Sequence, residues 1–439
     1  MKLARRRQLF YALYFLQIIG IFLVWLSKST QQLQVGGGAA LIAIGALSGL
    51  LAGFFFLYQL ILISGTKLIE KHFGLDRLAR IHHVTGLFGY GFLITHVLFI
   101  VLGYSSLTGN GFIEQYFALQ DLAYVTFASV SVFLLSAVIV TSIVIVRRRL
   151  KYELWYLVHL LVYAAVLLAL FHQVSNGQNL MGNDWLRAYW YGLYVVAFTL
   201  VLWRRWLMPL YLEYKHRFRV EKVVKENSGV TSVYVTGKNL DKFHYQAGQF
   251  NLWQFIQKDV RGMHHPFTIS SSPKDPYLQL SAKAVGDFTK KLDQLRPGAP
   301  ALISGPYGLF TQKVATGRQR LFIAGGIGVT PLRSMLRDDV RGDDILIYAT
   351  RTMKDAVFAD EFKKLEKQGL KVVHVLSDEK RKAAHHGYVS ADILTSEVND
   401  ITERDIWLCG PPVMMQKVEE ALAGLNVPKK RIHTEKFKL

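Results

Sequence analysis

The chain has 439 residues, of which 51% are hydrophobic, and its formal net charge is +20. Its mean hydropathy of +0.21 argues against a wholly soluble protein, because soluble chains of this length are usually less apolar. The positive charge does not indicate nucleic-acid binding, since much of it lies beside apolar segments and no DNA- or RNA-binding motif is present. A single cysteine, Cys409, excludes an intramolecular disulfide and a cysteine-based metal site.

Six long apolar runs occupy the first half of the chain, at residues 10–26, 39–63, 81–102, 122–146, 154–172 and 188–203. Most of them are long enough to cross a bilayer core, which takes about 20 helical residues. The first run follows Arg5, Arg6 and Arg7 and lacks a small-residue cleavage site, so we expect it to be kept as a helix. These runs predict a six-helix transmembrane bundle.

Lysine and arginine gather in alternate loops between these runs. One set of loops carries Lys2, Arg5, Arg6, Arg7, Lys67, Lys71, Arg77, Arg80, Arg147, Arg148, Arg149, Lys151, Arg204 and Arg205. The opposite loops carry only Lys28 and Arg187. The positive-inside rule therefore predicts an integral protein of the bacterial plasma membrane, with the amino terminus and the second half of the chain cytoplasmic. The basic loops would also lie against anionic lipid.

Two of the apolar runs each carry a pair of histidines, His82 with His96 and His159 with His172. At 1.5 Å per residue, each pair is separated by roughly 20 Å of a bilayer core of about 30 Å. The predicted topology places His82 and His159 near the inner face and the other two near the outer face. A single imidazole in a membrane helix often only forms a hydrogen bond to a neighbouring helix, but four imidazoles at matched depths indicate metal ligands. Facing imidazoles can ligate haem iron from both sides, so we predict two stacked haems, b-type because no cysteine is placed to attach them.

The inner ligand has an alternative in His83. At 100° per residue, a spacing of 14 returns within about 40° of the same helix face, whereas 13 misses by about 140°, which favours His82. Gly86 would also leave room for a porphyrin beside that helix. The His159–His172 spacing is itself 13, so that helix is expected to be locally unwound or strongly tilted, and His83 remains open.

Residues 217–310 show short alternating strands, typical of an antiparallel barrel. AGQF at 247–250 is a turn entering a strand. HPFTISSS at 265–272 offers an aromatic side chain, a strand edge and hydroxyls that would line a flat ring with polar edges. GDFT at 286–289 precedes a helical run, whose exposed amides would hold a pyrophosphate.

Residues 318–439 alternate strands and helices. A buried strand, RLFIA at 320–324, leads into GGIGVTP at 325–331, where the glycines let the backbone approach a phosphate. A second strand ends at Arg351, a cation that can meet a ribose 2′-phosphate or be an ordinary surface arginine. A later strand ends in CGPP at 409–412, at the carboxyl edge of the sheet where open α/β folds bind ligands.

HPFTISS, GGIGVTP and CGPP together resemble the ferredoxin–NADP reductase fold, and with six preceding helices the chain resembles the NADPH oxidase / ferric reductase family. The resemblance implies a six-helix haem domain at 1–208, an FAD-binding β-barrel domain at 213–312, and an α/β NAD(P)H-binding domain with a parallel sheet at 318–439. It further implies that electrons pass from NADPH, or NADH, to FAD and then singly through two b-type haems.

Carried over by position, the resemblance also implies site residues. The metal ligands are His82, His96, His159 and His172; the flavin contacts are His265, Pro266, Phe267, Thr268 and Ser270; its phosphates meet Gly286 and Thr289. The nucleotide phosphates meet Gly326, Gly328, Thr330 and Pro331; Arg351 reads the 2′-phosphate; Gly410 and Pro411 lie near the nicotinamide. Cys409, beside the nicotinamide, and Phe437, an aromatic that shields the flavin, would take part in hydride transfer.

The external electron acceptor stays open. We expect O2, giving superoxide, with ferric chelates as the alternative. A third reading is a haem-bearing electron donor for a partner protein or quinone, although no obligatory protein partner is evident. The external loops at 103–121 and 174–187 hold ordinary polar residues and no metal-chelating cluster. A transporter is disfavoured because there is neither an internal repeat nor a Walker motif.

Overall fold

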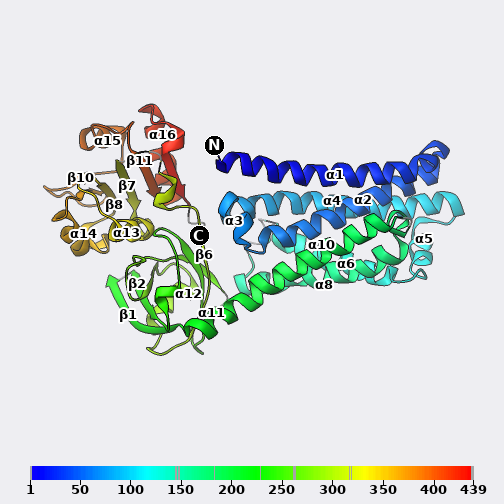
Figure 1. The fold of residues 1–439 in the computed structure, drawn as a ribbon, viewed down its shortest axis with the longest axis horizontal. Helices are drawn as coiled ribbons and strands as arrows, with labels where there is room; N and C mark the ends of the chain where they lie inside the picture. The colour runs from blue at the N-terminus through cyan, green and yellow to red at the C-terminus, as the bar shows by residue number, and fades with distance from the viewer. Residues whose placement is uncertain are drawn as a thin grey trace. The chain divides into compact units, whose positions relative to one another are not determined.

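The computed structural model describes residues 2–143, 146, 149–181, 183–227, 229–260, 264–315, 317 and 319–436. The chain divides into two compact units, Met1–Leu207 and Met208–Leu439. Figure 1 shows that the first is built from long helices and the second from sheets and shorter helices.

The described part of the first unit is helical. Its helices are α1 (Lys2–Val35), α2 (Gly37–Ile63), α3 (Lys67–Phe73), α4 (Leu75–Thr108), α5 (Phe112–Leu119), α6 (Val125–Ser142), α8 (Tyr152–Asn176), α9 (Gln178–Met181) and α10 (Asp184–Val201), the last continuing as a π-helix (Leu202–Leu207). Six helices, α1, α2, α4, α6, α8 and α10, are long and apolar enough to cross a membrane, which confirms the predicted six spans. The short α3, α5 and α9 were not predicted.

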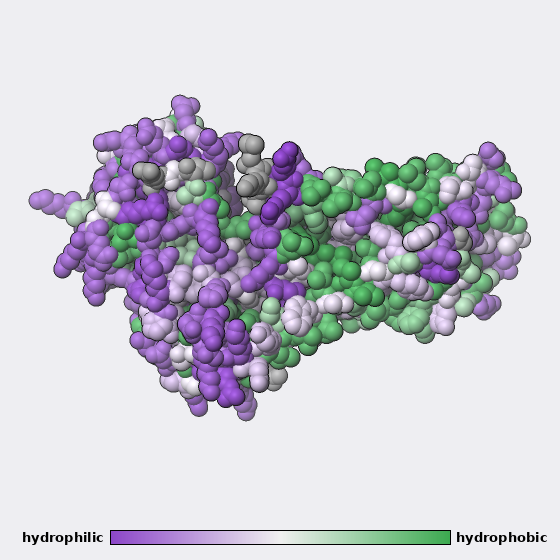
Figure 2. Space-filling model, in the orientation of Figure 1, coloured by the Kyte–Doolittle hydropathy of each residue, from purple (hydrophilic) through white to green (hydrophobic). Residues whose placement is uncertain are grey.

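The outer surface of this bundle is suited to lipid. Large apolar side chains are exposed along the spans, among them Leu16, Phe88, Phe133, Leu157 and Val195. On the face shown in Figure 2, apolar residues cover the middle of the bundle. Only α2 is mainly internal: 56% of its most apolar window is buried, against 11–28% in the other five spans. The helix α2 therefore forms the centre of the bundle.

Glycines on α2 allow close packing with its neighbours. Gly45, Gly49 and Gly53 recur every four residues and so share one helix face. A Cβ atom at Gly45 would lie 3.1 Å from the Ile100 side chain of α4, and one at Gly53 would lie 2.8 Å from Trp190 of α10. The small residues thus bring α4 and α10 against α2.

The first lobe of the second unit begins with α11 (Met208–His216). It contains β1 (Arg219–Asn227), β2 (Val230–Thr236), β3 (Phe250–Phe255), β4 (His265–Thr268), β5 (Leu278–Lys283), α12 (Asp287–Lys290) and β6 (Ala301–Tyr307). The predicted antiparallel architecture is confirmed, but the strands form two three-stranded sheets, β1-β2-β5 and β4-β3-β6, instead of a closed barrel. An isolated bridge links Arg219 to Pro300. Backbone hydrogen bonds flank this bridge, from Ala301 N to the Phe218 carbonyl at 3.0 Å and from Val220 N to the Ala299 carbonyl at 2.9 Å, so β1 also contacts the segment that leads into β6.

The second lobe is a six-stranded parallel sheet of order β10-β9-β8-β7-β11-β12. Its elements are β7 (Arg320–Gly325), α13 (Val329–Asp338), β8 (Ile345–Thr350), α14 (Ala359–Glu366), β9 (Lys371–Leu376), β10 (His385–His386), α15 (Ala391–Glu397), β11 (Asp405–Cys409), α16 (Pro412–Gly424) and β12 (Ile432–Glu435). The parallel nucleotide-binding sheet is confirmed. Its strand order reverses between β7 and β11, which is where such sheets bind ligands.

Candidate functional site

The four membrane histidines form two facing pairs between α4 and α8. The ring centres of His82 and His159 are 6.0 Å apart, with 55° between their planes. Those of His96 and His172 are 6.2 Å apart, with 57° between their planes. His83 is exposed. The structure thus brings His82, and not its neighbour, against α8.

Both separations fit two axial imidazoles on one iron. A metal–nitrogen bond of about 2.0 Å on each side, plus roughly 1.1 Å from each nitrogen to its ring centre, predicts about 6 Å between ring centres. Two facing imidazoles are a donor set that haem iron takes. The described residues contain no cluster of three or more His, Cys, Asp or Glu.

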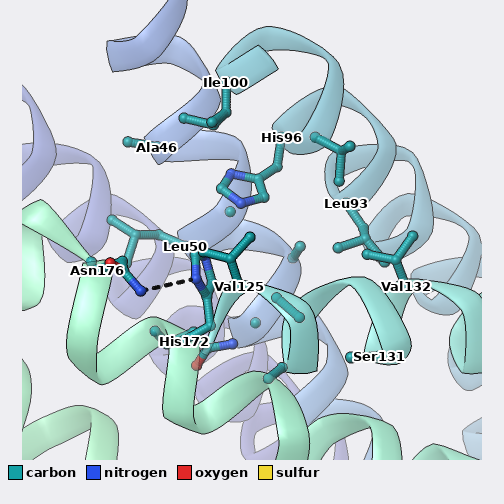
Figure 3. A pocket seen from close by; sticks show the side chains of 18 of the residues that line it. Ala46, Leu50, Leu93, His96, Ile100, Val125, Ser131, Val132, His172 and Asn176 are labelled. Carbon is teal, nitrogen blue, oxygen red and sulfur yellow. Dashed lines mark hydrogen bonds between the residues drawn. The ribbon is translucent and has the colours of Figure 1, made fainter. Parts of the chain in front are cut away.

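The outer pair borders a cavity of about 480 Å³. In Figure 3, His96 and His172 extend into it from different helices among apolar side chains that include Leu50, Leu93 and Val132. A pocket of this size and character is typical of sites for large flat ligands. Asn176 lies at its edge, with its Nδ2 3.4 Å from His172 Nδ1.

His96 is oriented by α2. Its Nδ1 is 2.8 Å from the carbonyl oxygen of Gly45, so Nδ1 carries the proton and donates it, leaving Nε2 unprotonated. The ring lies over Gly49, where a Cβ atom would come within 2.7 Å of Nδ1. The glycine stripe of α2 therefore makes room for this imidazole as well as for the helix that carries it.

Of the two adjustments expected of the second histidine helix, local unwinding is absent. The helix α8 runs without interruption from Tyr152 to Asn176, yet both its histidines reach their partners. Whether two histidines face each other depends on where the partner helix lies at that depth. An angular offset between two histidines of one helix therefore does not prevent both from facing partners.

The flavin motif lies at the edge of a sheet. Strand β4, which holds His265, Pro266, Phe267 and Thr268, is an outer strand of the sheet β4-β3-β6. The Thr268 hydroxyl is buried and has no hydrogen-bond partner among the described residues. An unsatisfied buried hydroxyl on an outer strand fits a flat ring with polar edges. The pyrrolidine ring of Pro266 is exposed on the same strand.

An aromatic residue outside the predicted set joins this strand. Phe288 of α12 stacks on His265, with ring centres 4.1 Å apart, and lies 5.9 Å from the ring of Phe267. It is the third residue of the GDFT motif, so its place in a predicted patch was the available signal. The missed residues of the membrane unit, Gly45 and Gly49, were signalled by their four-residue spacing.

Two predicted flavin contacts have other roles in this structure. The buried Ser270 hydroxyl donates to the Gln279 carbonyl at 3.0 Å, and the Ser270 carbonyl accepts from Arg333 of α13 at 2.7 Å. The Thr289 hydroxyl accepts from the amide of Gly286 at 2.9 Å. Ser270 therefore joins the two lobes, and Thr289 caps one of the amides expected to meet phosphate.

The glycine loop after β7 divides into exposed and packed positions. Gly326 has φ +51° and open space where a Cβ would lie, as a phosphate-approaching glycine requires. Gly328 instead permits close packing, since its Cβ would lie 2.4 Å from the carbonyl oxygen of Cys409. Thr330 donates to the carbonyl of Ile327 at 3.0 Å, and Pro331 is buried in α13. Of the two predicted glycines, Gly326 has open space beside it and Gly328 does not.

The remaining predicted residues that the structure describes lie at the carboxyl edge of the parallel sheet. Arg351 is exposed after β8 and forms no ion pair within the described part of the chain. Cys409 ends β11 beside β7 and is fully buried; burial, with the nearby Glu435, raises the pKa of its thiol. Gly410 is buried against Gly325, and Pro411, which follows it, is exposed. Phe437 lies outside the described residues.

Three family models match the chain in succession. Residues 48–170 match a ferric reductase-like transmembrane component, residues 216–311 an FAD-binding domain, and residues 322–420 an oxidoreductase NAD-binding domain.

Curated relatives share about half of the chain. A glycine betaine monooxygenase reductase subunit from Pseudomonas aeruginosa is 28% identical over 51% of this chain, which spans 64% of that relative's length. A sulfhydrogenase 2 subunit gamma from Pyrococcus furiosus is 30% identical, and the match covers 45% of this chain and 75% of that relative's length. Among solved structures, the FAD/NAD-binding domain of a nitric oxide dioxygenase from Vibrio cholerae is 24% identical, with a TM-score of 0.44 over 50% of this chain and 97% of that one. The three matches in succession give the chain the domain architecture of a ferric reductase / NADPH oxidase-type transmembrane oxidoreductase fused to a ferredoxin–NADP reductase-like module.

Proposed function

We propose that this protein carries electrons from cytosolic NADPH, with NADH as a possible substitute, through FAD and two b-type haems to an acceptor outside the bacterial plasma membrane. The observation that carries the proposal is the pair of facing imidazoles at two depths, 6.0 and 6.2 Å between ring centres. When bound, FAD accepts two electrons as a hydride, and haem iron passes them on one at a time.

The chain's own residues would supply binding and orientation. His82 with His159, and His96 with His172, would be the axial ligands of the inner and outer haems. The edge of β4 and the Thr268 hydroxyl would hold the flavin ring, while Gly326 and Arg351 would meet the nucleotide phosphates. The working domains would be 1–208 for haem, 213–312 for FAD and 318–439 for NAD(P)H.

We favour O2 as the acceptor, giving superoxide. The surroundings of His96 and His172 are mostly apolar, so a haem held there would be reached by a small neutral molecule more readily than by a charged iron chelate. The ferric reductase-like family model supports the alternative, ferric-chelate reduction. The third reading, electron donation to a partner protein or quinone, is supported by a relative named as the reductase subunit of a monooxygenase and by another named as the gamma subunit of a sulfhydrogenase.

The test uses purified full-length protein in detergent. A pyridine haemochrome assay should count two haems per chain, and His96→Leu or His172→Leu should leave one. A count of zero or one in the unaltered protein would contradict the proposal. Loss of haem in His83→Leu with full retention in His82→Leu would show that the inner ligand is misassigned.

The acceptor is then determined with NADPH as donor. Superoxide yield and ferric-chelate reduction are measured with and without O2. Superoxide formation that exceeds chelate reduction in air supports the oxidase reading. Chelate reduction that is unaffected by O2 supports a ferric reductase. Reduction of the haems without turnover on either acceptor supports a partner protein or quinone.

A further inference from the structure

Helix α13 joins the second lobe of the second unit to the first. The helix begins at Val329, directly after the glycine loop that is expected to meet the nucleotide phosphates. Arg333 and Arg337 are four residues apart and so lie on one face of the helix. Between them in the sequence, the Ser334 hydroxyl donates at 2.6 Å to the carbonyl oxygen of Ser271, which belongs to the flavin motif. The helix that follows the nucleotide loop thus contacts the segment that follows strand β4.

The guanidinium of Arg333 is nearly enclosed, with 3% of the side chain exposed. Its Nη1 donates to the carbonyl oxygen of Ser270 at 2.7 Å and to Oε1 of Gln279 at 2.9 Å, both in the first lobe. A guanidinium only donates, so the oxygen of the Gln279 amide must face Arg333. The Gln279 nitrogen then donates to two hydroxyl oxygens, Oγ of Ser232 at 3.1 Å and Oγ of Ser281 at 3.2 Å. All these contacts agree with one orientation of the amide.

A carboxylate of the second lobe holds Arg333 from the other side. Glu361, in the first turn of α14, has its Oε2 2.8 Å from Arg333 Nε and 2.7 Å from Arg333 Nη2. Its Oε1 accepts from Arg337 Nη1 at 2.6 Å, and Arg337 Nη2 donates to Asp275 of the first lobe at 2.7 Å. The two cations and two carboxylates balance in charge, as buried and half-buried ions require. Arg333 is therefore fixed to both lobes at once.

The backbone that Arg333 contacts is itself held in place. Ser270 follows Thr268, whose buried hydroxyl is a candidate flavin contact, by two positions. The Ser270 amide donates to the Gln279 carbonyl at 2.8 Å, and the Ile269 amide donates to the Gln249 carbonyl at 2.9 Å. These bonds tie the segment to its neighbours on successive residues. The position of Arg333 is therefore linked to the position of the flavin motif.

We propose that Arg333 is a positioning residue for flavin reduction: by fixing α13 to Ser270 and Gln279, it sets the distance between the nucleotide and the flavin. The inference rests on the proposed function, since it takes NADPH to bind at the glycine loop and FAD at β4. Hydride transfer breaks a C–H bond of the nicotinamide and forms an N–H bond on the flavin ring, and both electrons travel with the hydrogen. Its rate falls about 100-fold when the reacting groups are misplaced by about 1 Å.

The experiment is anaerobic rapid mixing of NADPH with full-length protein loaded with FAD, which gives a limiting rate of flavin reduction and a Kd for NADPH. Arg333→Met keeps an apolar side chain of similar length against the ring of Phe358, whose centre lies 4.2 Å from Arg333 Cζ. We expect the limiting rate to fall by about 10–100-fold, because the two lobes lose their fixed separation. The Kd should change by less than about threefold, since the glycine loop keeps its own contacts.

A matched control is Arg404→Met. Arg404 is similarly enclosed, with 7% of its side chain exposed, and it also pairs with a carboxylate, that of Asp400, at 2.6 Å. Its other bonds, to the carbonyl oxygens of Arg320 at 2.9 Å and Asp343 at 2.6 Å, stay within the second lobe. Both variants should melt at a lower temperature, but only Arg333→Met should slow flavin reduction. Equal slowing in the two variants would assign the effect to general destabilisation and overturn the proposal.

Hydrogen–deuterium exchange supplies a readout that does not depend on turnover. The amides of residues 269–272 should exchange faster in Arg333→Met than in Arg404→Met, and equal exchange would contradict the link between the lobes. If Arg333→Met does not retain FAD, Gln279→Met takes its place, because it removes one acceptor in the first lobe and leaves Arg333 paired with Glu361. An unchanged limiting rate in Gln279→Met would then overturn the proposal.

Failure of this inference can be told apart from failure of the proposed function. If NADPH reduces the flavin of the unaltered protein and of Arg333→Met at the same limiting rate, this inference fails and the proposed function stands. If neither NADPH nor NADH reduces the flavin of the unaltered protein, the proposed function itself fails.

Discussion

Replacing Gly49 by alanine is expected to remove the outer haem selectively. An alanine Cβ at this position would lie 2.7 Å from His96 Nδ1 and 2.9 Å from its Cε1. Both distances are shorter than carbon and nitrogen atoms tolerate, and Gly49 sits in the middle of α2, where the backbone cannot easily retreat. The imidazole must therefore move.

The size of the movement follows from the contact distances. To reach an ordinary separation of about 3.5 Å, the His96 ring must move away from α2 by roughly 0.8 Å. Its hydrogen-bond acceptor, the Gly45 carbonyl, is also on α2, so the 2.8 Å bond would lengthen to roughly 3.6 Å and be lost. Loss of such a partner typically weakens metal binding by about 10–100-fold.

Pyridine haemochrome counts before and after detergent dialysis would measure this loss, with low-spin EPR signals to report each haem. Gly91→Ala is the matched control, since a Cβ there meets nothing within 4 Å. We expect one haem in Gly49→Ala and two in Gly91→Ala. Retention of both haems in Gly49→Ala with unchanged EPR signals would refute the packing argument. Equal haem losses in both variants would show that any glycine-to-alanine change in these helices has this effect, whatever the Cβ contacts.

Three further predictions concern the second unit. Arg351→Ala should raise the KM for NADPH about tenfold or more with little change for NADH, since a charge-assisted contact to a 2′-phosphate contributes about 1.5–3 kcal/mol; equal effects in steady-state assays with both nucleotides would exclude this role. Phe437→Ala should strengthen nicotinamide nucleotide binding, because an aromatic over the flavin must be displaced first, and rapid-mixing flavin reduction with unchanged rate and affinity would rule out a gate. Burial raises the pKa of Cys409, so the folded state keeps a proton that the unfolded chain releases above about pH 8.5. The contribution of the protonated thiol to stability is complete below that pH and is lost as the pH rises further. The melting temperature should therefore fall more steeply between pH 8 and 10 in the unaltered protein than in Cys409→Ala, and parallel falls in the two proteins would contradict this.

Much of the architecture could be predicted because it depends on local composition. Runs of apolar residues long enough to span a bilayer, and strands followed by glycine loops, are readable from neighbouring residues alone. The pairing of the antiparallel strands was less predictable. The contact of β1 with the segment that leads into β6, through Arg219 and Pro300, joins residues about 80 positions apart, and no local pattern reports such a pairing.

The candidate nucleotide site shows the same division. The motif placed GGIGVTP at a strand end, but it could not separate Gly326, which has open space above it, from Gly328, which packs against Cys409. Ser270 likewise belongs to a flavin-like motif, yet its backbone carbonyl binds Arg333 from the other lobe. A sequence motif indicates which residue types a site requires, but it does not indicate which neighbour each residue contacts.

By itself, the sequence determined the depth of the four histidines, because helical rise is constant and charged loops set the level of each span. Only the tertiary structure decided that His82 rather than His83 faces α8, and that Gln59 and Gly45 lie against the Nδ1 atoms of His82 and His96. The physical reason is that depth is a property of one helix, whereas direction and hydrogen-bond partner depend on how closely helices far apart in the chain approach each other. At His96, Gly45 and Gly49 of α2 allow that approach, since one supplies the carbonyl that Nδ1 contacts and the other leaves room for the ring.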